Sequence, residues 1–147
     1  KRQHMFQDID SLYFAGNLAD ERFRINNERY LGEWTKSKLY GELTDYANLA
    51  LLSDGEAHPL VCLEALSAGL GLVLSEYSTA NLDLSLPFID VIEESKISDK
   101  DYVKKVIEEN RKKSVGMRNE IREYAESFGW EKIVKLHYLP AIERITK

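Results

Sequence analysis

SDGEAHPLVCLEALSAGLGLVLS, residues 53–75, is the stretch that decides the fold. We interpret it as the end of a strand, a tight turn, a short helix that Pro59 opens and Gly69 closes, and a second strand over residues 71–75. The helix is apolar on nearly every side apart from Glu64, and such a helix is normally buried. A buried carboxylate is costly unless a polar group meets it, so we expect Glu64 to bind a ligand or to form an ion pair.

The composition is that of one globular domain over residues 1–147, with 44% hydrophobic residues and a formal net charge of -5. The absence of a basic stripe argues against a nucleic-acid-binding module. Cys62 is the only cysteine, which excludes an intrachain disulfide and a Cys-rich zinc site. No apolar run is long enough to span a membrane and no signal peptide is visible, so we expect a cytoplasmic protein. Residues 1–10 are polar, and we expect a linker or a disordered start there.

Short apolar strands alternate with helices along the rest of the chain. The predicted strands are residues 11–15, 29–32, 46–53 and 87–92. The predicted helices are residues 36–45, a helix with Ser98 as N-cap, residues 118–127 and a C-terminal segment 131–147 that Pro140 interrupts or kinks. We expect Trp130 to be a packing anchor for the last segment. The alternation predicts the α/β class, with a Rossmann-like three-layer domain and a mostly parallel sheet.

Ligands of such sheets bind outside the carboxyl ends of the strands. Here these ends are residues 16–17, 32–34, 53–56 and 75–79, and we expect the four loops to line one crevice. The start of the central helix offers free backbone N–H groups to an anion, with a carboxylate on either side. A ligand with hydroxyls at both ends and a diphosphate between them fits this pattern, and a nucleotide sugar is such a ligand.

Several motifs resemble the retaining glycosyltransferases of the GT-B fold, family 4. Residues 56–69 are similar to their E-x7-E signature, usually EGFGLxxLEAMAxG, and residues 72–75 to the strand that follows it. Residues 30–32 resemble the F-L-G strand end of the family, and residues 128–131 resemble its late F-S-W-E turn. The resemblance implies that the chain from about residue 30 onward is the C-terminal, donor-binding half of a GT-B fold.

The resemblance also implies roles for single residues. Glu56 would be the catalytic carboxylate at the transferred sugar, and Glu64 would hydrogen-bond the ribose of a UDP- or GDP-sugar. The other donor-binding residues would be Ala57, His58, Pro59, Leu60, Gly16, Asn17, Gly32, Glu33, Ser78 and Thr79. The reaction would retain the anomeric configuration and need neither a metal nor a further cofactor.

Two departures from the family pattern lie on the phosphate side. Asn17 stands where active members carry the Arg of G-R-L, and Ala57-His58-Pro59 replaces Gly-Phe-Gly. Arg22 or Arg24 could take over the contact with the diphosphate. The acceptor-binding partner would be an N-terminal Rossmann-like domain, in cis or in trans, and any peripheral membrane contact would come through that half.

Three functions therefore stay open. The first is glycosyl transfer by an incomplete enzyme that lacks its acceptor-binding domain. The second is a nucleotide-sugar epimerase of the GT-B type, which converts a donor without an acceptor. The third is a degenerate, non-catalytic binding or assembly module.

Overall fold

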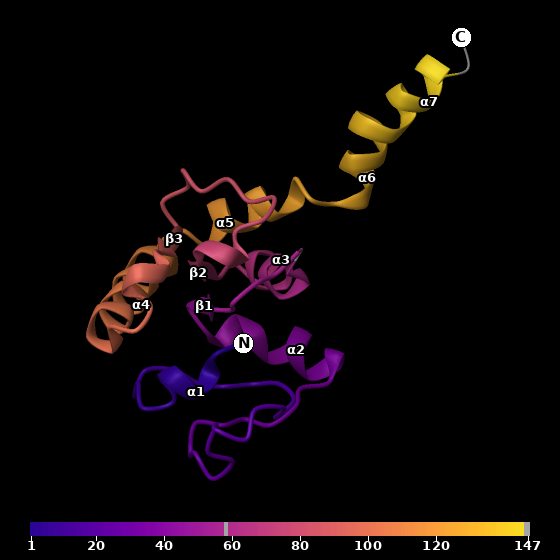
Figure 1. Ribbon diagram of the computed structural model, residues 1–147. Coiled ribbons are helices and arrows are strands. Elements are labelled where there is room, and N and C mark those ends of the chain that lie inside the picture. The colour runs from indigo at the N-terminus through magenta and orange to yellow at the C-terminus, as the bar shows by residue number, and fades with distance from the viewer. Residues whose placement is uncertain (58, 146–147) are drawn as a thin grey trace.

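A parallel three-stranded sheet forms the centre of the computed structural model, which describes residues 1–57 and 59–145 (Figure 1). Its strands are β1 (Asn48–Leu51), β2 (Gly71–Ser75) and β3 (Ile89–Ile92), in the order β1-β2-β3. Both strand pairs are parallel, with Asn48 opposite Gly71 and Leu72 opposite Ile89. The prediction of an α/β fold with a parallel sheet is confirmed.

The middle strand, β2, is buried over its whole length because it has a neighbouring strand on each edge and a hydrophobic cluster on each face. Val73 points into one cluster, whereas Leu72 and Leu74 belong to the other. This alternation follows from the two-residue period of a strand. The sheet is thus covered on both faces, as expected for a parallel arrangement.

Helices α3 (Leu60–Ser67) and α5 (Arg118–Glu126) pack together on one face of the sheet. Their buried members in this cluster are Cys62, Ala65, Leu66 and Ile121. Pro59 is the N-cap of α3, and the helix ends before Gly69, whose φ of 81° favours glycine. Cys62 is a core residue and is 1% exposed.

The other face is covered by α4 (Lys100–Val115) and by the beginning of the chain, where α1 spans Gln3–Phe6. Phe6 and Ile9 are 3% and 4% exposed and belong to the same cluster as Val103 and Ile107. The apolar side chains among the first ten residues are therefore core, and this segment is not the linker or disordered start that its polar composition indicated.

The N-cap of α4 is Asp99 instead of Ser98, because the Asp99 carboxylate accepts a hydrogen bond from the Tyr102 amide at 3.0 Å. Either residue type suits this position, so the sequence alone does not distinguish two adjacent candidates.

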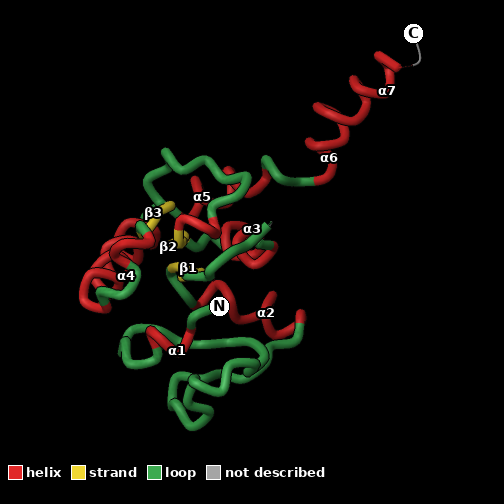
Figure 2. The backbone as a smooth tube through the Cα atoms, viewed as in Figure 1, coloured by secondary structure: helices red, strands yellow, loops and turns green. Residues whose placement is uncertain are grey.

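The region between α1 and β1 is mostly loop (Figure 2). The two strands predicted there form a single parallel bridge, between Phe14 and Tyr30, and this bridge is separate from the central sheet. Gly16 and Gly32, with φ values of 122° and 75°, end the extended backbone just beyond the bridge. Helix α2 (Lys36–Glu42) follows, with Thr35 as its N-cap, and a 3-10 turn over Leu43–Asp45 leads toward β1.

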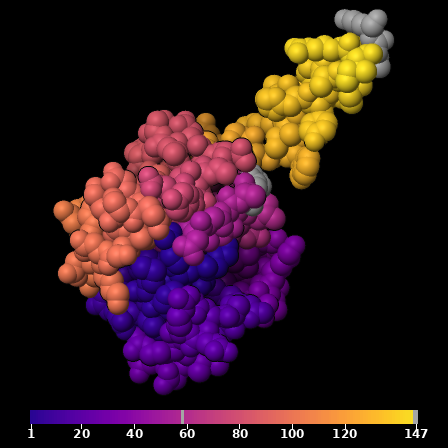
Figure 3. All heavy atoms as spheres, viewed as in Figure 1, coloured from indigo at the N-terminus to yellow at the C-terminus, as the bar shows by residue number. Residues whose placement is uncertain are grey.

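Two further 3-10 turns, Glu76–Ser78 and Glu94–Lys96, follow β2 and β3. The last helical segment consists of α6 (Trp130–Ile133), a π-helical turn over Val134–Tyr138 and α7 (Leu139–Ile145). It projects away from the body of the molecule (Figure 3). The expected packing of Trp130 is wrong, since this side chain is 76% exposed.

The helical hydrogen-bond register changes beside Pro140, because the π turn ends directly before α7 and Pro140 is the second residue of α7. The segment continues as a helix on both sides of this change. In the described part of the chain, no helix has the length and apolar character required to cross a membrane.

Candidate functional site

The loops that leave β1 and β2 are joined at the carboxyl end of the sheet. The Ser75 hydroxyl donates to the Ser53 carbonyl at 2.6 Å, and the Glu56 amide donates to the Tyr77 carbonyl at 2.9 Å. Residues 53–56 and 75–79, two of the four loops of the predicted crevice, therefore lie together. The first turn of α3 begins beside them.

Glu56 carries the first carboxylate of this edge, and its side chain is 16% exposed. It forms an ion pair with Lys1, whose side chain is half exposed. The same ammonium group acts on Cys62 in the first turn of α3: burial raises the pKa of that thiol to about 12, and the Lys1 charge opposes the shift. A carboxylate and a cation thus meet at the start of α3.

Glu64 lies in the second turn of α3, away from the buried side formed by Cys62, Ala65 and Leu66. It is only partly buried, so the expectation of a fully buried carboxylate is wrong. The helix is less enclosed than its apolar composition suggests, since Leu60 is 65% exposed. Among the described residues, the Glu64 side chain has no hydrogen bond or ion pair.

Residues 57–60 lead from Glu56 to the first residue of α3, the helix that carries Glu64. Ala57 is exposed and Pro59 is buried, whereas His58, predicted to bind the donor, lies outside the described residues. Among the residues that the structure describes, no side chain caps the first turn of α3. The amides of Leu60 and Val61 are therefore the donors that a helix start leaves to an external acceptor.

Ser78 and Thr79 follow β2 and form hydrogen bonds within their own loop. Ser78 is fully buried and its hydroxyl lies 2.9 Å from that of Ser75. The Thr79 hydroxyl donates to the Glu76 carbonyl at 3.1 Å. Both hydroxyl groups are engaged within the loop after β2, and the contact of Ser78 and Thr79 with a donor stays a prediction.

The remaining predicted residues belong to the separate bridge between Phe14 and Tyr30. The Gly16 amide donates to the Gly32 carbonyl at 2.9 Å, and Asn17 and Glu33 are exposed. A small cavity at Gly16 and Asn17 includes no residue of the loops after β1 and β2. The four strand ends thus form two pairs, and hydrogen bonds join the members of each pair.

The two arginines expected to replace the family's Arg are already paired. Arg22 donates to both carboxylate oxygens of Asp20 at 2.9 Å and holds the pKa of that carboxyl below its usual range. Arg24 pairs with Asp8. Two other cations lie at the end of β1: Lys1, which pairs with Glu56, and Arg2, which donates to the Leu52 carbonyl. Sequence reasoning missed both because only the folded chain brings them there.

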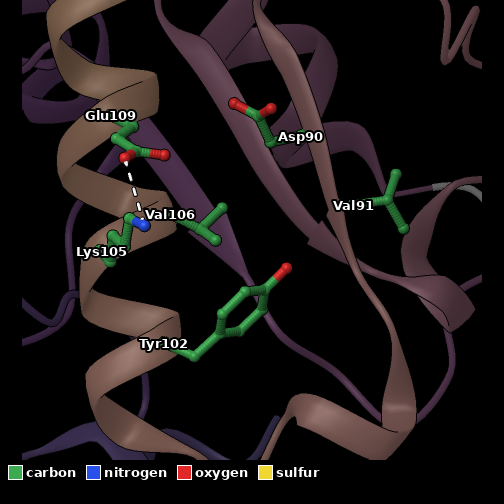
Figure 4. A pocket seen from close by; sticks show the side chains of 6 residues that line it. All are labelled: Asp90, Val91, Tyr102, Lys105, Val106 and Glu109. Carbon is green, nitrogen blue, oxygen red and sulfur yellow. Dashed lines mark ion pairs between the residues drawn. The ribbon is translucent and has the colours of Figure 1, made fainter.

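A larger cavity, of about 220 Å³, lies between β3 and α4 (Figure 4). It is lined by Asp90, Val91, Tyr102, Lys105, Val106 and Glu109. The Asp90 carboxylate accepts hydrogen bonds from Asn110 and Lys113, and Lys105 pairs with Glu109 at 3.9 Å. None of the predicted site residues that the structure describes lines this cavity.

Within residues 1–57 and 59–145, no group of three His, Cys, Asp or Glu side chains is arranged to hold a metal ion. Comparison with known proteins finds no family model, no curated protein and no solved structure that matches this chain.

Proposed function

We propose that this chain binds a nucleoside-diphosphate sugar and is the donor-binding domain of a retaining glycosyltransferase. The observation that carries the proposal is the partly buried Glu64 carboxylate, which has no protein partner among the described residues and lies one turn beyond the uncapped start of α3. The Lys1–Glu56 ion pair lies at that same start. The resemblance of residues 56–69 to the E-x7-E signature gives these groups their proposed roles.

The Glu64 carboxylate suits the ribose end of such a ligand. A partly buried carboxylate without a partner gains from hydrogen-bond donors, and a ribose offers two adjacent hydroxyl groups. The four residues from Leu60 to Glu64 correspond to about 6 Å along the helix axis. A diphosphate at the helix start and a ribose at Glu64 are thus within the reach of one nucleotide.

The first turn of α3 and Lys1 suit the diphosphate. Backbone N–H groups at a helix start attract phosphate, and a lysine ammonium group adds a full positive charge. Glu56, which pairs with Lys1, would accept hydrogen bonds from the hydroxyl groups of the sugar. In this proposal Lys1 supplies the charge that Asn17 cannot supply.

One observation favours a second candidate, a degenerate binding module without catalysis. Arg22 and Arg24 are engaged by carboxylates, and Ser78 is buried, so the phosphate side has fewer free groups than an active family member would offer. The two candidates share the donor site and differ in turnover. Transfer would also require the acceptor-binding domain, in cis or in trans.

Isothermal titration with UDP-glucose and GDP-mannose tests the donor site. We expect Glu64→Ala to weaken binding about 10-fold or more, because one or two charge-assisted hydrogen bonds contribute about 1.5–3 kcal/mol. Glu123→Ala, which removes an exposed carboxylate of α5, is the matched control and should leave the affinity unchanged. Absence of binding at millimolar ligand, or equal affinity of the Glu64→Ala variant, refutes the proposal.

An assay of sugar transfer in the presence of the acceptor-binding domain distinguishes the enzyme from the degenerate module. Sugar transfer that Glu56→Ala abolishes supports the enzyme, whereas donor binding without transfer or hydrolysis supports the degenerate module.

A further inference from the structure

Arg2 is a buried cation at the end of β1. Its side chain is 8% exposed. The Nε group donates to the Leu52 carbonyl and one Nη group to the Ser53 carbonyl, both at 2.8 Å. These two carbonyls come directly before the turn that carries Glu56. The guanidinium therefore fixes the backbone from which the turn starts.

The same guanidinium contacts carboxylates from two strand exits. Its Nε lies 2.9 Å from Asp54, after β1, and its two Nη groups pair with Glu94, after β3. The Glu94 amide in turn donates to the Glu76 carboxylate, after β2, at 2.7 Å. One side chain thus links the exits of all three strands.

The backbone of Arg2 is left-handed, with φ of 56° and ψ of 16°. A residue with a Cβ atom adopts this conformation at a cost, and such residues persist where surrounding contacts enforce them. In Arg2 the five guanidinium contacts, with Leu52, Ser53, Asp54 and both oxygens of Glu94, enforce the left-handed conformation. The conformation also sets the direction of the preceding residue, Lys1, whose ammonium group meets Glu56.

We infer that Arg2 is a positioning residue of the donor site. It holds residues 53–56 at the end of β1 and directs the Lys1 ammonium group toward Glu56. The role at the donor rests on the proposed function, whereas the effect on the turn is independent of any ligand. In this inference Arg2 does not itself contact the donor, since its Nε group and both Nη groups already donate to protein acceptors.

Arg2→Gly removes the guanidinium but permits the same backbone conformation, because glycine adopts a left-handed φ without strain. The variant therefore measures the contribution of the side chain alone. Arg24→Gly, which removes an exposed arginine paired with Asp8, is the matched control. We expect Arg2→Gly, and not the control, to speed amide hydrogen exchange at residues 54–57 about 10-fold or more. Unchanged exchange at these amides overturns the inference whether or not a donor binds.

The second measurement is affinity, by titration with the nucleotide sugar that the wild type binds and with the matching nucleoside monophosphate. Arg2→Gly should weaken binding of the nucleotide sugar about 10-fold and binding of the monophosphate less than about 2-fold. The reason is that Lys1 and Glu56 are proposed to contact the diphosphate and the sugar, and the monophosphate lacks both of these parts. In a Lys1→Met background, Arg2→Gly should add less than a further 2-fold, because the two residues act together.

A wild type that binds no nucleotide sugar refutes the proposed function and leaves the exchange experiment to decide on the turn. A wild type that binds, with an Arg2→Gly variant that binds equally well, overturns the positioning role at the donor. An equal loss for both ligands also overturns it, because it indicates general damage to the fold.

Discussion

Replacing Gly71 by alanine should destabilise the fold far more than its small size suggests. Gly71 is the first residue of β2 and is buried against α4. A Cβ atom at this position would overlap the Ser114 hydroxyl and lie 2.7 Å from the Asn110 side-chain oxygen. Both neighbours are themselves fully buried, so neither can move into solvent.

Asn110 makes the clash costly because its side chain is fully used. Its amide group donates to the carbonyls of Leu72 and Phe88 at 3.0 and 3.1 Å, and its oxygen accepts from Asn48 and Ser114. Moving the Asn110 side chain away from a new methyl group breaks its hydrogen bonds to Leu72 in β2 and to Phe88, directly before β3. Moving Ser114 instead bends α4 away from the sheet.

The magnitude follows from three contributions. Overpacking in a buried site costs about 1–3 kcal/mol, and disturbing the Asn110 and Ser114 bonds costs about 1–2 kcal/mol more. Replacing glycine lowers the entropy of the unfolded chain, which returns about 0.4–1 kcal/mol. The free energy of unfolding should therefore fall by about 1–5 kcal/mol, a large part of the stability of one domain.

Urea unfolding followed by circular dichroism measures this change. Gly41→Ala is the control, because Gly41 lies in α2 with open space around it, and alanine there should stabilise the helix slightly. Ser114→Gly removes the atoms that the new methyl group meets, so the double variant should lose less than the sum of the two single changes. A Gly71→Ala loss below about 0.5 kcal/mol, or additive losses in the double variant, would refute the packing described for this corner.

Two other outcomes are expected. Arg118 donates to the carbonyls of Thr44 and Tyr46 at 3.0 and 2.7 Å, so Arg118→Ala should lower the free energy of unfolding by about 1–2 kcal/mol in the same urea assay, and an unchanged midpoint would contradict this. Burial raises the pKa of the Cys62 thiol to about 12, so the thiol should resist iodoacetamide at pH 8 in the native state and react once urea unfolds the chain. Its contribution to stability is complete below the unfolded-state pKa of about 8.5 and is lost as the pH rises toward 12, a decline that Cys62→Ala should lack.

The central stretch was predicted well because its signals are local. Pro59, Gly69 and the apolar run of β2 mark a helix start, a helix end and a buried strand within about twenty residues, and all three agree with the structure. The start of α4 was placed one residue early, since Ser98 and Asp99 are both good N-caps. Such neighbouring alternatives differ by side-chain geometry, which sequence does not contain.

The features that were missed depend on contacts between distant parts of the chain. Lys1 lies 55 residues from Glu56 in sequence and Arg2 lies 50 residues from Leu52. No pattern within the first ten residues indicates where these two side chains lie in the fold. The exposure of Glu64 was misjudged because α3 has apolar side chains on its outer side too, of which Leu60 is an example. Periodicity cannot reveal which apolar face a fold leaves uncovered.

The position of the amino end has a practical consequence for any ligand measurement on this chain. Figure 1 shows that end beside β1, and Lys1 reaches Glu56 at the start of α3. An affinity tag fused there would emerge next to the very groups under test and could compete with a charged ligand. A tag after the projecting α7 would stand clear of the sheet, so the placement of the tag becomes part of the experimental design.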